Sequence, residues 1–180
     1  MTAILKVDTI QDTSGNNIIN ESSDTITIGA SGDTISIPSG GKLTAPGHVL
    51  QVIQANTGTE VTHSTSYADT GLSASITPSS TSNKVLVRIE QACFAGGDGG
   101  GAIKLMRDST SIYTPAVNYA FYGDGSSLDL RNNHCYSFLD SPSSTSAITY
   151  KTQGRSYNST VFKTQNDALK SFITLMEVAG

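Results

Sequence analysis

The sequence predicts an all-β protein in which a short intertwined β stalk precedes an antiparallel β-sandwich of the jelly-roll type. Charged residues make up only 14% of the chain and apolar residues 37%, a balance that favours β structure over helices. Short alternating segments recur between turn clusters, and one segment is an almost perfect tandem repeat. The length of 180 residues leaves room for one ordinary domain and an appendage.

Residues 1–23 are predicted to form an N-terminal attachment segment rather than a domain. A short strand pattern, in which Leu5, Val7 and Ile10 are apolar, is followed by a turn cluster of Asp, Thr, Ser, Gly and Asn. The stretch is too short and too polar to carry a core of its own. We therefore interpret it as a segment that docks onto something larger.

A tandem repeat forms the predicted stalk and linker, residues 24–46. DTITIGASG (24–32) is followed by DTISIPSG (33–40), and each copy alternates like a short strand that ends in a turn. Burying a few isoleucines within one chain does not offset the entropy of ordering two isolated strands. We therefore expect several copies of the chain to bundle in parallel. The side chains expected to point at symmetry mates are Ile26, Ile28, Ile35 and Ile37.

Residues 47–180 are predicted to form the C-terminal sandwich, because strand patterns alternate there with turn clusters. In the last pattern both alternating sets are apolar, so that one face can fill the sandwich and the other a subunit interface. The alternative is a central strand covered on both faces within one subunit. The nine predicted strands are 49–55, 72–78, 84–95, 102–107, 111–114, 132–139, 147–153, 160–164 and 171–178.

Antiparallel strands reverse at every connection, so counting connections assigns each loop to one end of the sandwich. We call the end that follows the stalk proximal and the opposite end distal. The predicted distal loops are 56–70, 96–101, 115–131 and 154–159. The predicted proximal loops are 79–83, 108–110, 140–146 and 165–170.

The distal loops are rich in aromatic residues beside polar ones, a composition that suits glycan binding because rings lie on the apolar faces of sugars. The alternative is that the rings only pin a long loop to the sandwich or to a neighbouring subunit. The candidate receptor contacts are Tyr119, Phe121, Tyr122, Asp124, Asp98, Arg155 and Tyr157.

Charge and hydropathy disfavour two classes of partner. The net charge is −4 and no Lys/Arg cluster is present, whereas a nucleic-acid surface needs concentrated positive charge. No apolar run is long enough to span a membrane, and no signal peptide precedes the first strand pattern. We expect neither nucleic acid nor membrane insertion.

Metal sites and cofactors are not expected either. His134 and Cys135 are adjacent in a strand pattern and point to opposite faces, while His48 and His63 are expected to be solvated in polar loops. Cys93 and Cys135 are both expected to be free, buried thiols. Calcium-binding β-roll repeats present several Asp carboxylates and Gly pairs at their turns, and the tandem repeat matches that pattern only at Gly32 and Asp33.

The sequence also disfavours an enzyme. The Gly-rich run 96–101 lacks a following helix and is read as a flexible hairpin tip rather than a dinucleotide site. Paired carboxylates could cleave a glycan, but nearly all of the candidates sit in turns that enforce no fixed separation. These candidates are Glu90, Asp98, Asp124, Asp129 and Asp140.

Four segments together resemble tail-fibre and related appendage proteins of bacteriophages. They are ILKVDTIQDTSGN (4–16), GLSASITPSSTSNKVLV (71–87), DSPSSTSAITYKT (140–152) and ITLMEV (173–178), and the likeness covers most of the chain. The resemblance implies a homotrimeric virion structural protein, assembled in the host cytoplasm and then carried on the extracellular particle.

In that family's architecture, the N-terminal segment with Leu5, Val7 and Ile10 would dock onto other virion proteins, and the distal loops would meet a host glycan or protein. At 180 residues the chain is short for a tail fibre. A capsid-mounted fibre or a tail adaptor without a receptor role therefore stays open, as does a glycan-degrading tailspike.

Overall fold

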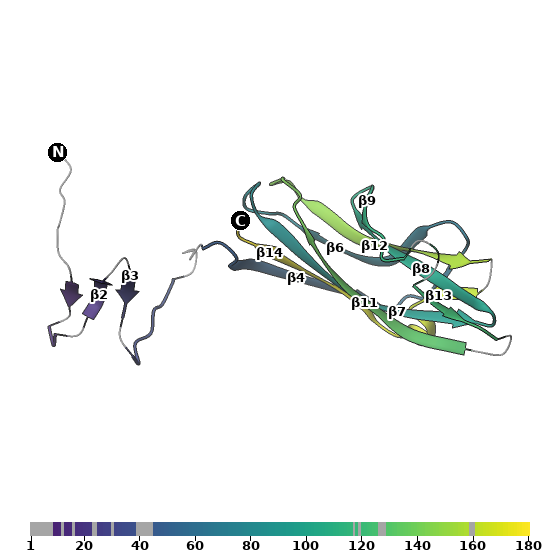
Figure 1. Ribbon diagram of the computed structural model, residues 1–180, viewed down its shortest axis with the longest axis horizontal. Coiled ribbons are helices and arrows are strands. Elements are labelled where there is room, and N and C mark those ends of the chain that lie inside the picture. The colour runs from purple at the N-terminus through teal and green to yellow at the C-terminus, as the bar shows by residue number, and fades with distance from the viewer. Residues whose placement is uncertain are drawn as a thin grey trace. The chain divides into compact units, whose positions relative to one another are not determined.

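The computed structural model describes residues 9–11, 13–15, 17–22, 25–29, 31–38, 45–116, 118, 120–125, 129–158 and 161–180. The chain divides into two compact units, Met1–Leu43 and Thr44–Gly180 (Figure 1). Nearly all of the described regular structure is β, and the one helical element is a short 3-10 turn. The predicted all-β class is confirmed. No described helix is long and apolar enough to cross a membrane.

The first unit contains an antiparallel meander of three short strands, β1 (Thr9–Gln11), β2 (Asn17–Ser22) and β3 (Thr25–Ile28), paired in that order. The first copy of the tandem repeat supplies β3. The second copy forms no strand in residues 33–38, although the described sheet leaves one edge of β3 unpaired. The predicted second rung is therefore absent from the isolated chain.

The four repeat isoleucines are all exposed in this unit, at 68% for Ile26, 54% for Ile28, 62% for Ile35 and 44% for Ile37. The predicted contacts with symmetry mates stay a prediction. Of the expected docking residues, Ile10 lies in β1 and is 41% exposed, while Leu5 and Val7 lie outside the described residues.

One sheet of the second unit is built around β7 (Lys84–Gly96). β11 (Asp129–Asp140) pairs along one edge of β7, and β14 (Ser171–Val178) and β13 (Val161–Thr164) share the other. β4 (Val49–Thr57) and β5 (Val61–His63) continue outward from β14 and β13. All of these pairings are antiparallel. Because β13 and β14 occupy one position in the sheet and β4 and β5 another, the described sheet has four strand positions.

The second sheet has the order β6 (Ala68–Ile76), β12 (Ile148–Tyr157), β8 (Gly99–Arg107), with β9 (Thr110–Tyr113) and β10 (Phe121–Gly123) sharing the free edge of β8. If the strand pairs β4/β5, β9/β10 and β13/β14 are each counted once, the sheets read 1-8-3-6 and 2-7-4-5 along the chain. This is the double Greek-key order of a jelly roll, and the predicted antiparallel sandwich is confirmed.

In the sandwich two short strands, β5 and β10, were not predicted, as β2 was not in the first unit, and one predicted connection of the sandwich is wrong. Residues 165–170 do not turn at the proximal end. They interrupt the edge of β7 between β13 and β14, which run in the same direction. Gln165, Asp167 and Ala168 have φ values between 55° and 59°, and the Gln165 amide still donates to the Ala92 carbonyl at 3.0 Å. The ladder therefore continues across the break.

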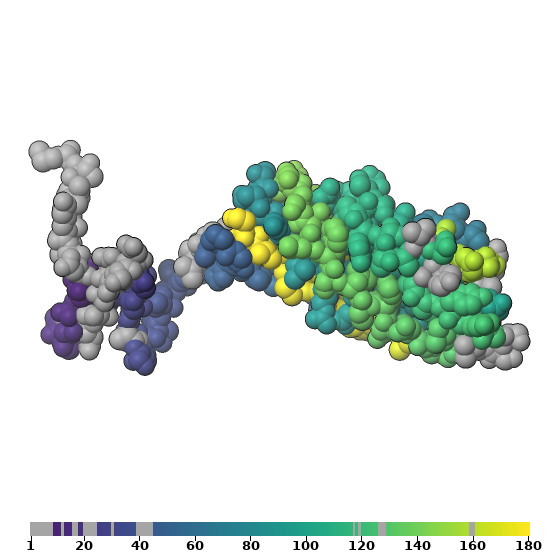
Figure 2. All heavy atoms as spheres, viewed as in Figure 1, coloured from purple at the N-terminus to yellow at the C-terminus, as the bar shows by residue number. Residues whose placement is uncertain are grey.

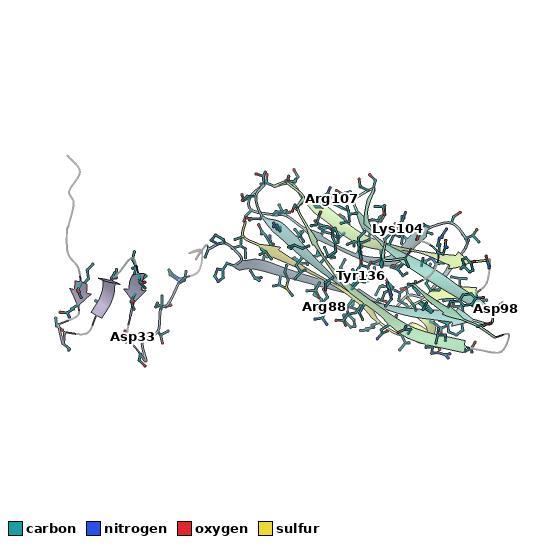
Figure 3. The ribbon with its side chains drawn as sticks, viewed as in Figure 1. Asp33, Arg88, Asp98, Lys104, Arg107 and Tyr136 are labelled. Carbon is teal, nitrogen blue, oxygen red and sulfur yellow. The ribbon has the colours of Figure 1, made fainter. Side chains whose placement is uncertain are left out.

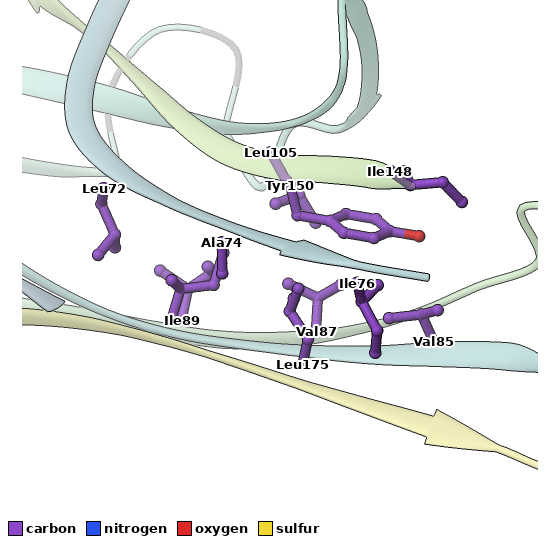
Figure 4. Packing of buried hydrophobic residues seen from close by; sticks show 11 residues of the cluster. Leu72, Ala74, Ile76, Val85, Val87, Ile89, Leu105, Ile148, Tyr150 and Leu175 are labelled. Atoms are coloured by element: carbon purple, nitrogen blue, oxygen red, sulfur yellow. The ribbon is translucent and has the colours of Figure 1, made fainter. Parts of the chain in front are cut away.

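The main core lies between the two sheets and is filled by alternate residues of β6, β7, β8, β12 and β14 (Figure 4). Leu72, Val87 and Leu175 are 1% exposed or less. A smaller cluster of Cys93, Ile103 and Phe162 lies toward the distal end. Cys135 is exposed, contrary to prediction, because it takes the outer-face position of β11 while its neighbours His134 and Tyr136 face inward.

A buried polar bridge joins the two sheets. The Thr152 hydroxyl of β12 donates to the Gln91 side-chain oxygen of β7 at 2.7 Å, and Thr152 also bonds Thr70 of β6 at 2.5 Å. The Gln91 amide donates to the Ser171 hydroxyl at 2.9 Å. All four side chains are fully buried, so these bonds satisfy groups that would otherwise be costly to bury.

The outer face of the β7 sheet carries an apolar row. Val52, Met176, Leu86 and Leu139 are in register across β4, β14, β7 and β11. Val52 and Leu139 are half exposed and the other two are half-buried. The last strand is therefore not covered on both faces within one subunit, which removes that alternative for the described chain.

The first and the last residues of the sandwich both lie at its proximal end. The Gly47 amide donates to the Ala179 carbonyl at 2.8 Å, and the Ala179 amide donates to the His48 carbonyl at 2.9 Å. In Figure 2 the C-terminal residues (yellow) accordingly lie beside the first residues of the sandwich (blue). The distal loops thus lie at the opposite end of the sandwich from residues 47–48 and Ala179.

Candidate ligand-contact surface at the distal end

The distal end is formed by the turn that connects β7 of one sheet to β8 of the other, by β10 and by the last residues of β12, so the predicted hairpin is instead a connection between the two sheets. β7 and β8 are joined by only Gly97 and Asp98, and Figure 3 shows Asp98 at this extremity of the sandwich. β10 pairs with the first residues of β8, and Tyr157 at the end of β12 lies opposite Gly100 on the other edge of β8. β8 therefore brings three separate chain segments together.

Tyr122 is at the centre of this surface. Its hydroxyl donates a hydrogen bond to an Asp98 carboxylate oxygen, and its ring meets that of Tyr157 edge-on, with centroids 6.0 Å apart and an interplanar angle of 81°. The bond to Asp98 is the main reason that the pKa of Tyr122 is raised to about 12, with the nearby Asp98 and Asp124 charges adding to it. At neutral pH the hydroxyl is protonated and orients the ring.

The Gly-rich run is structural rather than a flexible tip. Gly99, Gly100 and Gly101 belong to β8, and all three are buried. A Cβ on Gly100 would lie 2.4 Å from the Phe121 carbonyl oxygen, and one on Gly101 would lie 2.3 Å from the Phe162 ring. Only glycine lets β10 and the core approach β8 so closely, so the prediction of a flexible tip is wrong beyond Gly97 and Asp98.

The remaining predicted contact residues divide between two roles. Phe121 packs against Phe162, with ring centroids 5.7 Å apart, and so pins β10 to the core. Arg155 lies on the outer face of β12 with its guanidinium carbon 5.2 Å from the centroid of the Tyr67 ring. Tyr119 lies outside the described residues. The structure therefore gathers Asp98, Tyr122 and Tyr157, with Asp124 close enough to affect Tyr122.

Two of the five candidate catalytic carboxylates, Asp140 and Glu90, are paired with arginines on other parts of the sandwich. Asp140 lies at the proximal end and accepts two hydrogen bonds from Arg107, at 2.9 and 3.0 Å, and one from the Tyr150 hydroxyl at 2.7 Å. Glu90 pairs with Arg88 at 2.8 Å on the outer face of β7. Among the described residues no three His, Cys, Asp or Glu side chains lie close enough together to hold a metal ion.

His63 is buried, which the sequence did not predict, and His134 is half-buried. His63 ends β5, is 4% exposed, and hydrogen-bonds the Thr164 hydroxyl at 3.0 Å. Burial lowers its pKa from 6.5 to about 4. His134 faces inward beside Tyr136, and burial lowers its pKa too. Both rings are neutral at pH 7 and belong to the packing of the distal half.

Two residues near this surface lacked a signal strong enough to single them out. Tyr67 precedes β6 in a polar loop, and Lys104 is an outward position of β8. The Lys104 ammonium lies 4.4 Å from the centroid of the Tyr67 ring. The alternation of residues 102–107 places Lys104 on the surface, but only the folded sheet brings it beside Tyr67 and Arg155.

No family model and no curated protein matches the sequence. The chain is similar to solved structures of VP2 from infectious bursal disease virus. A VP2 subviral particle is 13% identical, with a TM-score of 0.38 over 73% of this chain and 34% of that one. A VP2 mutant in T=1 particles is 14% identical, with a TM-score of 0.35 over 82% of this chain and 41% of that one. VP2 of the Gt strain is 13% identical, with a TM-score of 0.35 over 86% of this chain and 47% of that one.

The chain spans less than half the length of those VP2 proteins. A likeness at this TM-score and identity says nothing about function.

Proposed function

We propose that this chain is a virion appendage protein that attaches a virus particle to a host surface through the distal end of its sandwich. The observation that carries the proposal is the pairing of residues 47–48 with Ala179, which puts the first residues of the sandwich and its last strand's end at the same extremity. The opposite end then presents Tyr122, Tyr157 and Asp98 outward. The resemblance of four segments to bacteriophage appendages supplies the biological setting.

The ligand class that best suits this surface is a glycan. Two tyrosine rings held edge-to-face offer apolar faces for sugar rings, and the Asp98 and Asp124 carboxylates beside them accept hydrogen bonds from hydroxyls. We propose binding without catalysis, because Asp140 and Glu90 are each paired with an arginine and Asp98 is bonded to Tyr122. No cofactor is proposed.

We further propose that the protein is a homotrimer. The exposed repeat isoleucines would be buried by partner chains, which identical copies of the repeat can supply. The apolar row of Val52, Met176, Leu86 and Leu139 is the surface of the sandwich that a second copy would cover. Ile10, together with Leu5 and Val7, would dock onto another virion protein.

The direct test is adsorption to host cells. The full chain should bind the cells and compete with the virus, and the double variant Tyr122→Ala, Tyr157→Ala should lose this binding while keeping its oligomeric mass. Leu169→Ala, which removes an exposed apolar side chain from the interruption between β13 and β14, is the matched control. Binding unchanged by the double variant would favour a capsid-mounted fibre or adaptor with no receptor role.

A further inference from the structure

The outer face of the β6–β12–β8 sheet continues from the distal tyrosines. Along β12 the outward residues are Lys151, Gln153, Arg155 and Tyr157, each half-buried, while the residues between them are buried. Because alternate strand residues lie about 7 Å apart on one face, Arg155 directly follows Tyr157 on this surface. The tyrosine pair thus borders a polar strip on the same side of the sheet.

Two cations converge on one ring within this strip. Gln153 of β12 is in register with Lys104 of β8, and Arg155 is in register with Ala102, so Lys104 and Arg155 are diagonal neighbours. The Lys104 ammonium lies 4.4 Å and the Arg155 guanidinium carbon 5.2 Å from the centroid of the Tyr67 ring. The negative face of an aromatic ring attracts cations, so Tyr67 holds both at fixed positions.

The segment carrying Tyr67 is itself tied to β12. The Ser156 amide donates to the Ser64 carbonyl at 2.7 Å, which fixes the chain just before Tyr67 against the end of β12. Figure 3 shows Lys104 on the β8 side of the sandwich and Arg88 on the opposite side. The cation pair therefore belongs to the face that adjoins the distal tyrosines and not to the face with the apolar row.

The charges on this strip are unequally balanced. The Lys151 ammonium forms an ion pair with Asp69 at 2.7 Å, and Gln153 donates to the other oxygen of the same carboxylate at 2.7 Å. Lys104 has no carboxylate within ion-pair distance in the described part of the chain. A local positive site thus persists on a protein whose net charge is −4, and a charge without a counter-charge on a candidate binding face is suited to an anionic ligand.

We propose that Lys104 and Arg155 form a subsite for the anionic group of an acidic glycan, a carboxylate or a phosphate, whose sugar ring lies against Tyr157 and Tyr122. The subsite rests on the proposed receptor role and specifies its ligand class. The guanidinium of Arg155 can take two oxygens of the anion in parallel, and the ammonium of Lys104 adds a point charge from the neighbouring strand. Tyr67 is a positioning residue that orders both cations.

The test uses the full chain on a printed array of bacterial surface polysaccharides with uronate-bearing, phosphate-bearing and neutral members. Wild type should bind acidic members better than neutral ones, and the difference should shrink as salt is raised. Lys104→Gln should weaken binding to acidic members about tenfold, as expected for a charge-assisted hydrogen bond. It should leave neutral members unchanged. Lys84→Gln, an exposed lysine at the proximal end of β7, removes the same charge elsewhere and should change neither.

Tyr67 provides a second readout. Tyr67→Phe keeps the ring and should bind like wild type, whereas Tyr67→Leu should weaken acidic binding only. Equal weakening by Lys104→Gln and Lys84→Gln would overturn the subsite and leave only a net-charge effect. Preserved acidic binding in Lys104→Gln, with loss in the Tyr122→Ala, Tyr157→Ala variant, would overturn the subsite but keep the receptor role. Absence of any binding to the array and to host cells would overturn both.

Discussion

The two units of this chain treat the same residue type in opposite ways. The described isoleucines of the first unit, from Ile10 to Ile37, are all at least 37% exposed, whereas Ile76, Ile89, Ile103, Ile148 and Ile173 of the sandwich are 4% exposed or less. The sandwich closes two sheets over its own apolar side chains, while a three-stranded meander has no second layer. The sandwich therefore has a core of its own, whereas the described isoleucines of the first unit are left exposed in a single chain.

The largest expected effect is on the sandwich core. Phe162 is fully buried between Gly101, His63 and Phe121. Phe162→Ala should lower the free energy of unfolding of the sandwich by about 3–5 kcal/mol, because it leaves a cavity in a tightly packed site. Urea denaturation of the full chain measures this. The neighbouring exposed Val161→Ala is the control, and an equally small loss for both would show that the sandwich does not depend on this cluster.

A second test uses acid. The pKa of His63 is about 4 in the folded protein and about 6.5 when unfolded, so only the unfolded chain binds the proton between these values. Stability from this group is therefore complete above pH 6.5 and is lost as the pH falls toward 4, by about 3 kcal/mol. The free energy of unfolding, followed from pH 7 to 4, should show this slope.

The variants His63→Gln and His48→Gln separate the buried ring from an exposed one. His63→Gln should remove most of the slope, leaving the smaller parts that the half-buried His134 and carboxylates of lowered pKa such as Glu177 contribute in the same direction. His48→Gln, which replaces an exposed histidine by the same residue, glutamine, is the matched control. A slope of the same size in both variants would contradict a buried neutral His63.

A third test concerns the proximal end. The Glu177 carboxylate is 1% exposed and accepts hydrogen bonds from Gln51, Ser79 and Asn83 at 2.5–2.9 Å. Burial alone would raise its pKa, but the bonds from Asn83, Gln51 and Ser79 lower it on balance. Glu177→Gln turns an NH₂ group toward these donors and should cost about 2 kcal/mol in the free energy of unfolding.

The matched control for Glu177 is Glu90→Gln, which breaks the exposed pair with Arg88. It should cost about 1 kcal/mol or less, since exposed ion pairs contribute little. Thermal or urea unfolding compares the two variants directly. Equal losses would mean that the proximal end is not held by the buried carboxylate.

The smallest effect on the sandwich is expected from the repeat. Ile26→Ser with Ile35→Ser should leave the unfolding free energy of the sandwich unchanged within about 0.5 kcal/mol. The same variant should lower the oligomeric mass measured by light scattering, because the proposed contacts between copies are lost. Thr27→Ser with Ser36→Thr is the control and should keep the wild-type mass. A monomeric wild-type chain, or a double variant of unchanged mass, would contradict the proposed stalk.

Much of the sandwich could be predicted because most of its strands have a recognisable local sequence pattern. Alternation in β7, β12 and β14 follows directly from one face being buried, and turn residues separate the patterns. The short strands β5 and β10 were not predicted. β5 and β10 are too short to show a period, and they exist because β13 and β8 offer them an edge to pair with.

The sequence by itself determined the fold class, the alternation that chooses each strand's buried face, and the inability of the Asp-Thr-Ile repeat to bury its isoleucines. These depend on short-range periodicity, which is a property of neighbouring residues and does not depend on tertiary contacts. Only the tertiary structure decided that residues 165–170 interrupt an edge instead of turning, that His63 is buried, and that Lys104 and Arg155 meet at Tyr67. Those outcomes depend on strand register, which joins residues far apart in sequence and is set by how two whole sheets pack.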